Sequence, residues 1–148
     1  MNFRFDKLTV KAQEAVAGAQ NLAQEKGHPE LDSLHLLVTL VAQRDGIVKP
    51  ILDKIGVNAG QLSGLLNSEL SRLPKVTGGA TPGPNQALQQ VLQASMREAE
   101  AMKDDFVSTE HLLLALAKTP GKAQNLLQIN GVREADVLNA LRTIRGSS

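Results

Sequence analysis

Apolar residues recur along this chain at intervals of three and four, the spacing that places them on one face of an α-helix. The first stripe consists of Leu8, Ala12, Ala15, Val16, Ala19, Leu22 and Ala23. Similar stripes follow within residues 34–41, 47–55, 62–73, 88–102, 112–116, 126–127 and 137–144. No segment shows the strict alternation of apolar and polar residues that is typical of a half-buried strand. The pattern predicts an all-α chain of eight short helices and no sheet.

The chain also contains an internal repeat. The segment LDSLHLLVTL at 31–40 aligns with VSTEHLLLAL at 107–116, and this alignment makes His35 correspond to His111. Each histidine stands directly before a pair of leucines. A repeat of this length is the mark of a duplicated structural unit, each copy of which buries its apolar face against the other.

A second pair of segments extends the alignment. IGVNAGQLSGLL at 55–66 aligns with NGVREADVLNAL at 130–141, at nearly the same offset. We therefore expect one domain over the whole chain, built from two four-helix repeats at about 5–73 and 85–145 with a linker at 74–84. The apolar faces of the two repeats are predicted to pack together as one eight-helix bundle with a pseudo-twofold axis.

The middle of the chain is rich in Gly and Pro, and one spacing within it suggests a phosphate-binding loop. Gly78 and Gly83 are separated as in a P-loop, but that motif needs Lys and then Ser or Thr after the second Gly. Pro84 and Asn85 stand there instead. We expect residues 75–84 to lack regular structure and to join the two repeats, and we expect the domain to bind no ATP.

Composition narrows the range of partners. Among 148 residues, 16 Lys and Arg balance 15 Asp and Glu, and Trp, Tyr and Cys are absent. No clustered basic face is evident, and only Phe3, Phe5 and Phe106 could stack on bases. Both points argue against nucleic acid and against a helix-turn-helix DNA binder. Without Cys there is no disulfide or thiolate metal site. No apolar run approaches the length of a membrane span, so we expect no membrane partner and a cytoplasmic location.

Four motifs give the chain a family resemblance: FVSTEHLLLAL, LDSLHLLVTL, GVNAGQL and the pre-linker LSRLPKV. Together they resemble the doubled amino-terminal (Clp repeat) domain of the ClpB family of AAA+ protein disaggregases, over nearly the whole chain. The LPKV segment and the long linker favour this family over Clp unfoldases that feed a protease, whose N-domain mainly docks adaptor proteins. That second identity remains the alternative.

The resemblance implies a role and a set of partners. The domain is expected to engage unfolded or aggregated polypeptides through their exposed apolar segments. It is expected to be monomeric in isolation, to hold no cofactor, and to precede ATPase modules that use ATP and Mg²⁺. The parent chain is expected to form a homohexamer and to work with a DnaK-type chaperone.

Candidate binding residues also follow from the resemblance. Thr9, Asp104 and Glu110 match polar positions that the family uses in substrate engagement, and Leu92 matches a position in an apolar groove. Ala94 stands where a larger Leu occurs in some relatives, which leaves the depth of the groove open. Each residue has a plainer interpretation: Thr9 as a helix N-cap, Glu110 as an acid in a first helical turn and Leu92 as core.

Catalytic chemistry is not expected. His35 and His111 occupy matched places and lack a second ligand four residues on, so we interpret them as structural rather than as metal ligands. His28, before Pro29, is interpreted as loop surface. Adjacent acids at Asp104 and Asp105 lack the spread of oxygen ligands that Ca²⁺ needs, so we expect no metal site and no catalytic residue.

Comparison of the two repeats helps to separate structural residues from functional ones. A residue that both copies share is most simply explained by packing, whereas a residue that differs between the copies is a candidate for a functional role. Glu110 stands opposite Leu34 in the alignment, and Asp104 stands opposite His28. The second repeat therefore holds acids that the repeated fold does not require.

Overall fold

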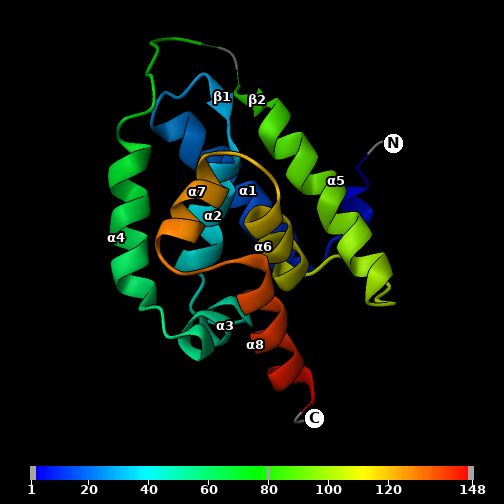
Figure 1. Ribbon diagram of the computed structural model, residues 1–148. Coiled ribbons are helices and arrows are strands. Elements are labelled where there is room, and N and C mark those ends of the chain that lie inside the picture. The colour runs from blue at the N-terminus through cyan, green and yellow to red at the C-terminus, as the bar shows by residue number, and fades with distance from the viewer. Residues whose placement is uncertain (1–2, 80, 147–148) are drawn as a thin grey trace.

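A computed structural model describes residues 3–79 and 81–146, so the extreme ends of the expected domain and residue 80 of the expected linker lie outside it. Within these residues the chain folds into eight α-helices (Figure 1), which confirms the all-α class. The helices are α1 Val10–Glu25, α2 Ser33–Ala42, α3 Val48–Ile55, α4 Ala59–Leu70, α5 Gln86–Ala101, α6 Thr109–Lys118, α7 Lys122–Ile129 and α8 Glu134–Gly146. A short 3₁₀ helix, η1, covers Phe5–Lys7.

Helix lengths repeat in order along the two halves. Helices α1 and α5 both have 16 residues, α2 and α6 both have 10, and α3 and α7 both have 8. Helix α4 has 12 residues and α8 has 13. The start signals repeat as well, because the side chains of Thr9 and Asn85 cap α1 and α5 by accepting from the backbone N–H three residues on.

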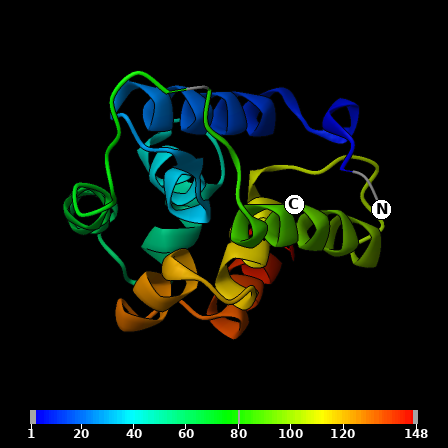
Figure 2. The ribbon, with the colours of Figure 1, turned by 90° about the horizontal axis from the view of Figure 1, so that it is seen from above.

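Helices α2 and α6 form the centre of the molecule. Both are apolar on almost every side and buried along most of their length. They contact each other, and each is surrounded by helices of both repeats. Seen from above (Figure 2), α1 and α5 flank this centre on different sides of the molecule. An all-round apolar helix is stable only when it is enclosed in this way.

Two very short parallel ladders tie the repeats together. Strand β1, Glu30–Leu31, pairs with β2, Gly83–Pro84, and Leu8 forms an isolated parallel bridge with Val107. The ladders are equivalent in the two repeats, since in each the residues before a long helix pair with the loop after the other long helix. Matching hydrogen bonds of 2.9 Å run from Thr9 N–H to the Val107 carbonyl and from Asn85 N–H to the Leu31 carbonyl.

The ladders depart from the expectation of no sheet. They also give Gly83–Pro84 regular structure, which was not expected for residues 75–84. The remaining described part of that segment is free of helix and strand, and the Val76 N–H reaches back to the Gly27 carbonyl at 2.8 Å. Two-residue strands leave no periodic signal in a sequence, and their pairing depends on how the repeats pack.

Candidate functional site

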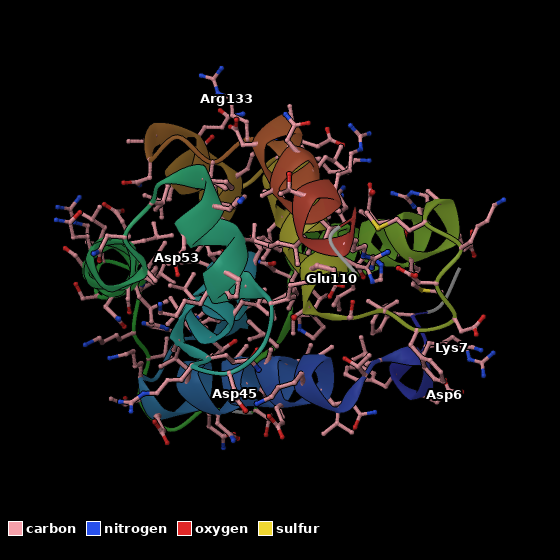
Figure 3. The ribbon with its side chains drawn as sticks, turned by 90° about the horizontal axis from the view of Figure 1, so that it is seen from below. Asp6, Lys7, Asp45, Asp53, Glu110 and Arg133 are labelled. Carbon is pink, nitrogen blue, oxygen red and sulfur yellow. The ribbon has the colours of Figure 1, made fainter. Side chains whose placement is uncertain are left out.

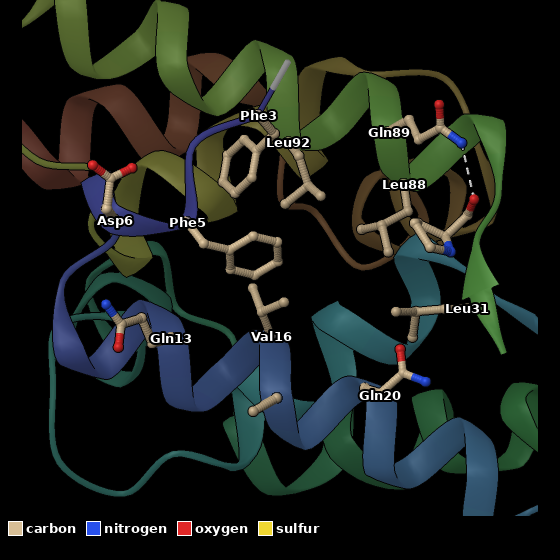
Figure 4. A pocket seen from close by; sticks show the side chains of 12 residues that line it. Phe3, Phe5, Asp6, Gln13, Val16, Gln20, Leu31, Leu88, Gln89 and Leu92 are labelled. Carbon is tan, nitrogen blue, oxygen red and sulfur yellow. Dashed lines mark hydrogen bonds between the residues drawn. The ribbon is translucent and has the colours of Figure 1, made fainter. Parts of the chain in front are cut away.

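A groove lies between α1, α5 and the N-terminal segment, by which we mean residues 3–7 (Figure 4). Its volume is about 720 Å³, within the range of roughly 300–1,000 Å³ usual for ligand pockets. The lining is apolar apart from one acid and three amides, and comprises Phe3, Phe5, Asp6, Gln13, Val16, Ala17, Gln20, Leu31, Pro84, Leu88, Gln89 and Leu92.

The two walls of the groove are equivalent faces of the repeats. Val16 on α1 and Leu92 on α5 correspond in the alignment, and so do Gln13 and Gln89. Each of these glutamines donates from Nε2 to the carbonyl oxygen five residues earlier, at 3.1 and 2.9 Å. These bonds use one of the two Nε2 hydrogens of each amide, so the second hydrogen and the Oε1 atom remain available beside the apolar surface of the groove.

Leu92 forms part of this apolar lining, as the resemblance implied, and also packs in the core. Only 6% of its surface is exposed, so this side chain is a core residue that also lines the groove. Ala94 is buried and does not line the groove. The small size of Ala94 therefore does not set the depth of this groove, because a residue two positions from Leu92 points to another side of α5.

Asp104 and Glu110 are brought together by a basic residue from the end of the chain. Arg145 on α8 donates to Asp104 Oδ2 at 2.8 Å and to Glu110 Oε2 at 3.0 Å. The Ser108 hydroxyl also donates to Glu110. Glu110 is only 9% exposed, and the view from below shows it beside the C-terminal part of α8 (Figure 3).

These contacts change the acidity of both carboxyl groups. The hydrogen bond from Arg145 holds the pKa of Asp104 below its ordinary value, assisted by His111. Burial acts to raise the pKa of Glu110, but hydrogen bonds from Ser108, the backbone and Arg145 outweigh it and hold that pKa below its ordinary value. Both acids are therefore charged at neutral pH and are already paired within the domain.

Thr9 serves the start of α1. Its hydroxyl accepts from Ala12 N–H at 3.2 Å, which confirms the N-cap interpretation. Its own N–H bonds to Val107, so Thr9 lies against the segment that joins Asp104 to Glu110. The structure thus places the polar trio around one segment, whereas Leu92 lies in the groove.

A second cleft, of about 420 Å³, borders the N-terminal segment; we call it the polar cleft because five charged residues line it, beside the apolar Met96, Ala99 and Val107. Asp104 lines it together with Glu100 and Asp105, and the N-terminal segment contributes Arg4 and Lys7. Of the polar trio, Asp104 is the residue that borders an open cleft.

The histidines have structural partners. His111 Nε2 lies 2.7 Å from Asp104 Oδ2, and His35 Nε2 lies 2.8 Å from His28 Nδ1. His28 is 2% exposed, so its assignment to loop surface is wrong. Proximity in sequence to Pro29 does not reveal that this loop folds over α2. Among the described residues, no group of three or more His, Asp or Glu is arranged to hold a metal ion.

Sequence reasoning missed the contributions of Phe3, Phe5 and Arg145. The alignment of Val16 with Leu92 was a usable signal for the groove, because equivalent residues meet near a pseudo-twofold axis. Nothing local to Arg145 indicates its partners, which lie 41 and 35 residues earlier. No described helix combines the length and apolar character that crossing a membrane would require.

Comparison with known proteins gives the family. The pattern of the Clp repeat (R) N-terminal domain matches residues 7–130. The chaperone protein ClpB of Rhodopirellula baltica is 49% identical over all of this chain, and that of Bacillus cereus is 36% identical over 96% of it. The chain spans 17% of the length of either relative.

Solved structures share the fold at lower identity. The Hsp104 N-terminal domain from Candida albicans is similar with a TM-score of 0.84 and 21% identity, over 96% of this chain and 93% of that one. A ClpV N-domain in complex with a VipB peptide gives a TM-score of 0.76 and 21% identity, over 97% of this chain and 89% of that one. The chain therefore belongs to the Clp repeat N-terminal domain family and corresponds to the amino-terminal domain of ClpB chaperones.

Proposed function

We propose that this domain engages clients for a ClpB-type ATP-dependent disaggregase by binding exposed apolar segments of unfolded or aggregated polypeptides. The observation that carries the proposal is the apolar groove between α1 and α5. Unfolded chains expose apolar side chains that folded proteins bury, and a surface groove of this chemistry removes such side chains from water.

The lining of the groove and a peptide complex of a similar fold both support a polypeptide ligand. Eight of the twelve residues that line the groove are apolar, so we propose that recognition depends mainly on apolar contact, and the amides of Gln13 and Gln89 can still bond to the backbone of an extended peptide. The ClpV N-domain with which this chain shares its fold was solved with a peptide bound. A peptide is therefore a ligand that this fold can accept.

The polar trio is proposed to assist at the edge of the site. Asp104 borders the cleft beside the N-terminal segment and keeps its charge, so it can attract basic residues that flank an apolar client segment. Glu110 holds Arg145 beside Asp104, and Thr9 fixes the start of the α1 wall. Leu92 is proposed to contact the client directly.

The parent chain completes the proposed activity. We propose that this domain is followed by AAA+ ATPase modules that bind ATP and Mg²⁺ and form a homohexamer. A DnaK-type chaperone is the proposed partner of the parent protein, and the cytoplasm is its proposed location. The relatives named as ClpB chaperones, each about six times as long as this chain, support a parent of this kind.

Adaptor docking is the second candidate. The N-terminal domain of the caseinolytic protease associated chaperone ClpD from Arabidopsis thaliana shares the fold, with a TM-score of 0.68. A domain of that kind would bind a folded adaptor protein and would leave unfolded polypeptide alone.

A charge placed in the groove tests the proposal. Ala17 is exposed on α1 and lines the groove, so Ala17→Glu puts a carboxylate there without disturbing the core. Binding of fluorescently labelled casein, measured by anisotropy, should weaken about tenfold or more, because the charge must be desolvated against apolar groups. Ala135→Glu, at an exposed position of α8, is the matched control and should bind as the parent does.

Other outcomes separate the candidates. A parent domain that does not bind casein, with or without a substitution in the N-terminal segment, would favour adaptor docking. Equal weakening by Ala17→Glu and Ala135→Glu would place binding outside the groove. Asp104→Asn, measured in the same titration, should weaken binding less than Ala17→Glu, and an unchanged affinity would remove Asp104 from the site.

A further inference from the structure

The N-terminal segment lines one side of the groove with aromatic side chains, and about 720 Å³ stays open beside them. Val16 and Leu92, on the facing helices, are only 8% and 6% exposed. Figure 4 shows the rings of Phe3 and Phe5 directed into the space between α1 and α5, close to Val16 and Leu92. The two rings pack edge to face, with centroids 5.3 Å apart and planes at 88°. An aromatic pair in this geometry is a favourable apolar unit, and here it lies where a client segment would bind.

Phe3 packs against the core, whereas the other side chains of the segment, at residues 4–7, are exposed. Phe5 remains 55% exposed, and η1 buries none of its residues. Among the described residues, the hydrogen bonds of Arg4 and Asp6 stay local: the two side chains pair, and the Arg4 carbonyl accepts from Lys7 N–H at 3.0 Å. Bonds to the rest of the domain begin at Lys7, whose carbonyl accepts from Val107 N–H.

The segment fits both of the surfaces that it borders. Phe3 and Phe5 face the apolar groove, whereas Arg4 and Lys7 face the polar cleft that contains Asp104. The two rings thus meet apolar surface, and the two basic side chains share a cleft with three acids, although Asp6 also lines the groove.

The repeat shows that the fold does not require aromatic residues here. Gly79 and Thr81 stand at the equivalent positions before α5, where the chain forms the same kind of ladder. The other repeat enters its long helix without aromatic side chains. Phe3 and Phe5 are therefore explained by the groove rather than by the start of α1.

We propose that the N-terminal segment partly fills the client groove, and that a client must displace it to reach the apolar faces of α1 and α5. The inference rests on the proposed function of the groove and adds its regulation. Because the segment is tethered at Lys7 and Leu8, it competes at a fixed local concentration. The apparent affinity for client is lowered by the fraction of time that the groove is occupied.

Removing the two rings tests the proposal in the full chain. The double variant Phe3→Ser/Phe5→Ser should bind labelled casein about three- to tenfold more tightly than the parent, as expected if the groove is free between a tenth and a third of the time. Ile129→Ser removes another exposed apolar side chain, on α7, and should leave the affinity unchanged. Circular dichroism and light scattering would verify that each variant is folded and of unaltered mass.

The direction of the change decides the question. Weaker binding by the double variant would mean that Phe3 and Phe5 are part of the binding surface, and an unchanged affinity would mean that they do not compete; either overturns the proposal. If the parent binds casein and Ala17→Glu weakens it, the proposed function stands even then. Failure of both the parent and the double variant to bind would overturn the function and this inference together.

A competition experiment gives a second measurement. A capped peptide FRFDKL, the sequence of residues 3–8, should displace casein from the double variant and should do so less well from the parent, whose groove it finds occupied. A peptide that fails to displace casein from the double variant at millimolar concentration would count against the proposal.

Discussion

Each repeat places a histidine in the first turn of its central helix, and the first bond of this residue is the same in both. His35 Nδ1 accepts the backbone N–H of Asp32 at 2.9 Å, and His111 Nδ1 accepts that of Ser108 at 2.9 Å. Both histidines thereby complete a capping box at the start of α2 or α6. A ring nitrogen that accepts carries no hydrogen, so the neutral ring donates from Nε2 in each case.

The second bond differs. His35 donates to the His28 ring at 2.8 Å, whereas His111 donates to the Asp104 carboxylate at 2.7 Å. This leaves His28 with its hydrogen on Nε2, which is buried and has no hydrogen-bond partner among the described residues. Asp104 instead gains a further partner, Arg145.

The comparison shows what the fold demands and what it leaves free. At this position it needs an acceptor for the central histidine, and either a neutral ring or a charged carboxylate satisfies that need. The carboxylate of the second repeat additionally binds the end of α8 and borders the polar cleft. The difference between the repeats is thus a charge brought to the surface beside the N-terminal segment.

The largest expected effect tests whether matched core positions of the two repeats contribute equally to stability. Leu37 and Leu113 are matched, and both are 0% exposed. Leu37→Ala and Leu113→Ala should each lower the free energy of unfolding by about 2–5 kcal/mol, through lost apolar burial and a residual cavity. Urea denaturation monitored by circular dichroism measures both. A loss of less than about 1 kcal/mol in the free energy of unfolding for either variant would mean that the two positions are not equivalent.

An intermediate effect separates the two histidine pairs by pH. Burial lowers the pKa of His28, with Lys75 and Lys26 adding repulsion. Burial and then His28 lower the pKa of His35, against the opposing pull of Asp32. Groups with a lowered pKa in the folded state take up protons on unfolding, so stability is full above pH 6.5 and is lost as pH falls through the folded pKa values.

His28→Asn keeps an acceptor for His35 and removes one titrating ring. Between pH 7.5 and 5.5 the parent should lose stability with a slope of up to about 1.4 kcal/mol per pH unit for each proton taken up, and the variant should have a shallower slope. Urea denaturation at three pH values measures the slopes. The contribution of Asp104, whose pKa is lowered, is present above its ordinary value of 3.8 and lost only as pH falls through its folded pKa, so this carboxylate contributes no slope in this range. Equal slopes would show that the first pair does not titrate.

The smallest effect concerns the turn after each long helix. Gly27 and Lys103 are equivalent and both left-handed, with φ of 70° and 60°. This conformation is free for Gly and costs another residue roughly 1–2 kcal/mol, against which Gly loses about 0.5–1 kcal/mol of backbone entropy in folding. Lys103→Gly should therefore raise the free energy of unfolding by about 0.5 kcal/mol.

The reverse change at the first turn should lower stability by about 1 kcal/mol. In Gly27→Ala the added Cβ would stand 3.0 Å from the Val76 carbonyl oxygen, in addition to the strain in φ. Thermal melts resolve differences of this size. If Gly27→Ala proves neutral, the linker moves away easily and the two turns are held less alike than their φ values indicate.

Local patterns were sufficient for the helices. The three- and four-residue spacing predicted all eight, and Thr9 was recognised as an N-cap because capping depends on a residue and its three successors. Local patterns did not reveal the burial of His28 or the strand at Gly83–Pro84. Burial of His28 depends on α2 lying beneath its loop, and the ladder at Gly83–Pro84 depends on a partner more than fifty residues away in sequence.

By itself, the sequence determined the helical class and the duplication, because both are periodic and each period is repeated within the chain. Only the tertiary structure decided what lies at the surface beside those helices. The groove arises where Val16 and Leu92 meet across the repeats and Phe5 folds over them. The pairing of Asp104 with Glu110 depends on Arg145, which contacts both acids. These contacts join residues far apart along the chain, and their energy is available only after the helices have packed.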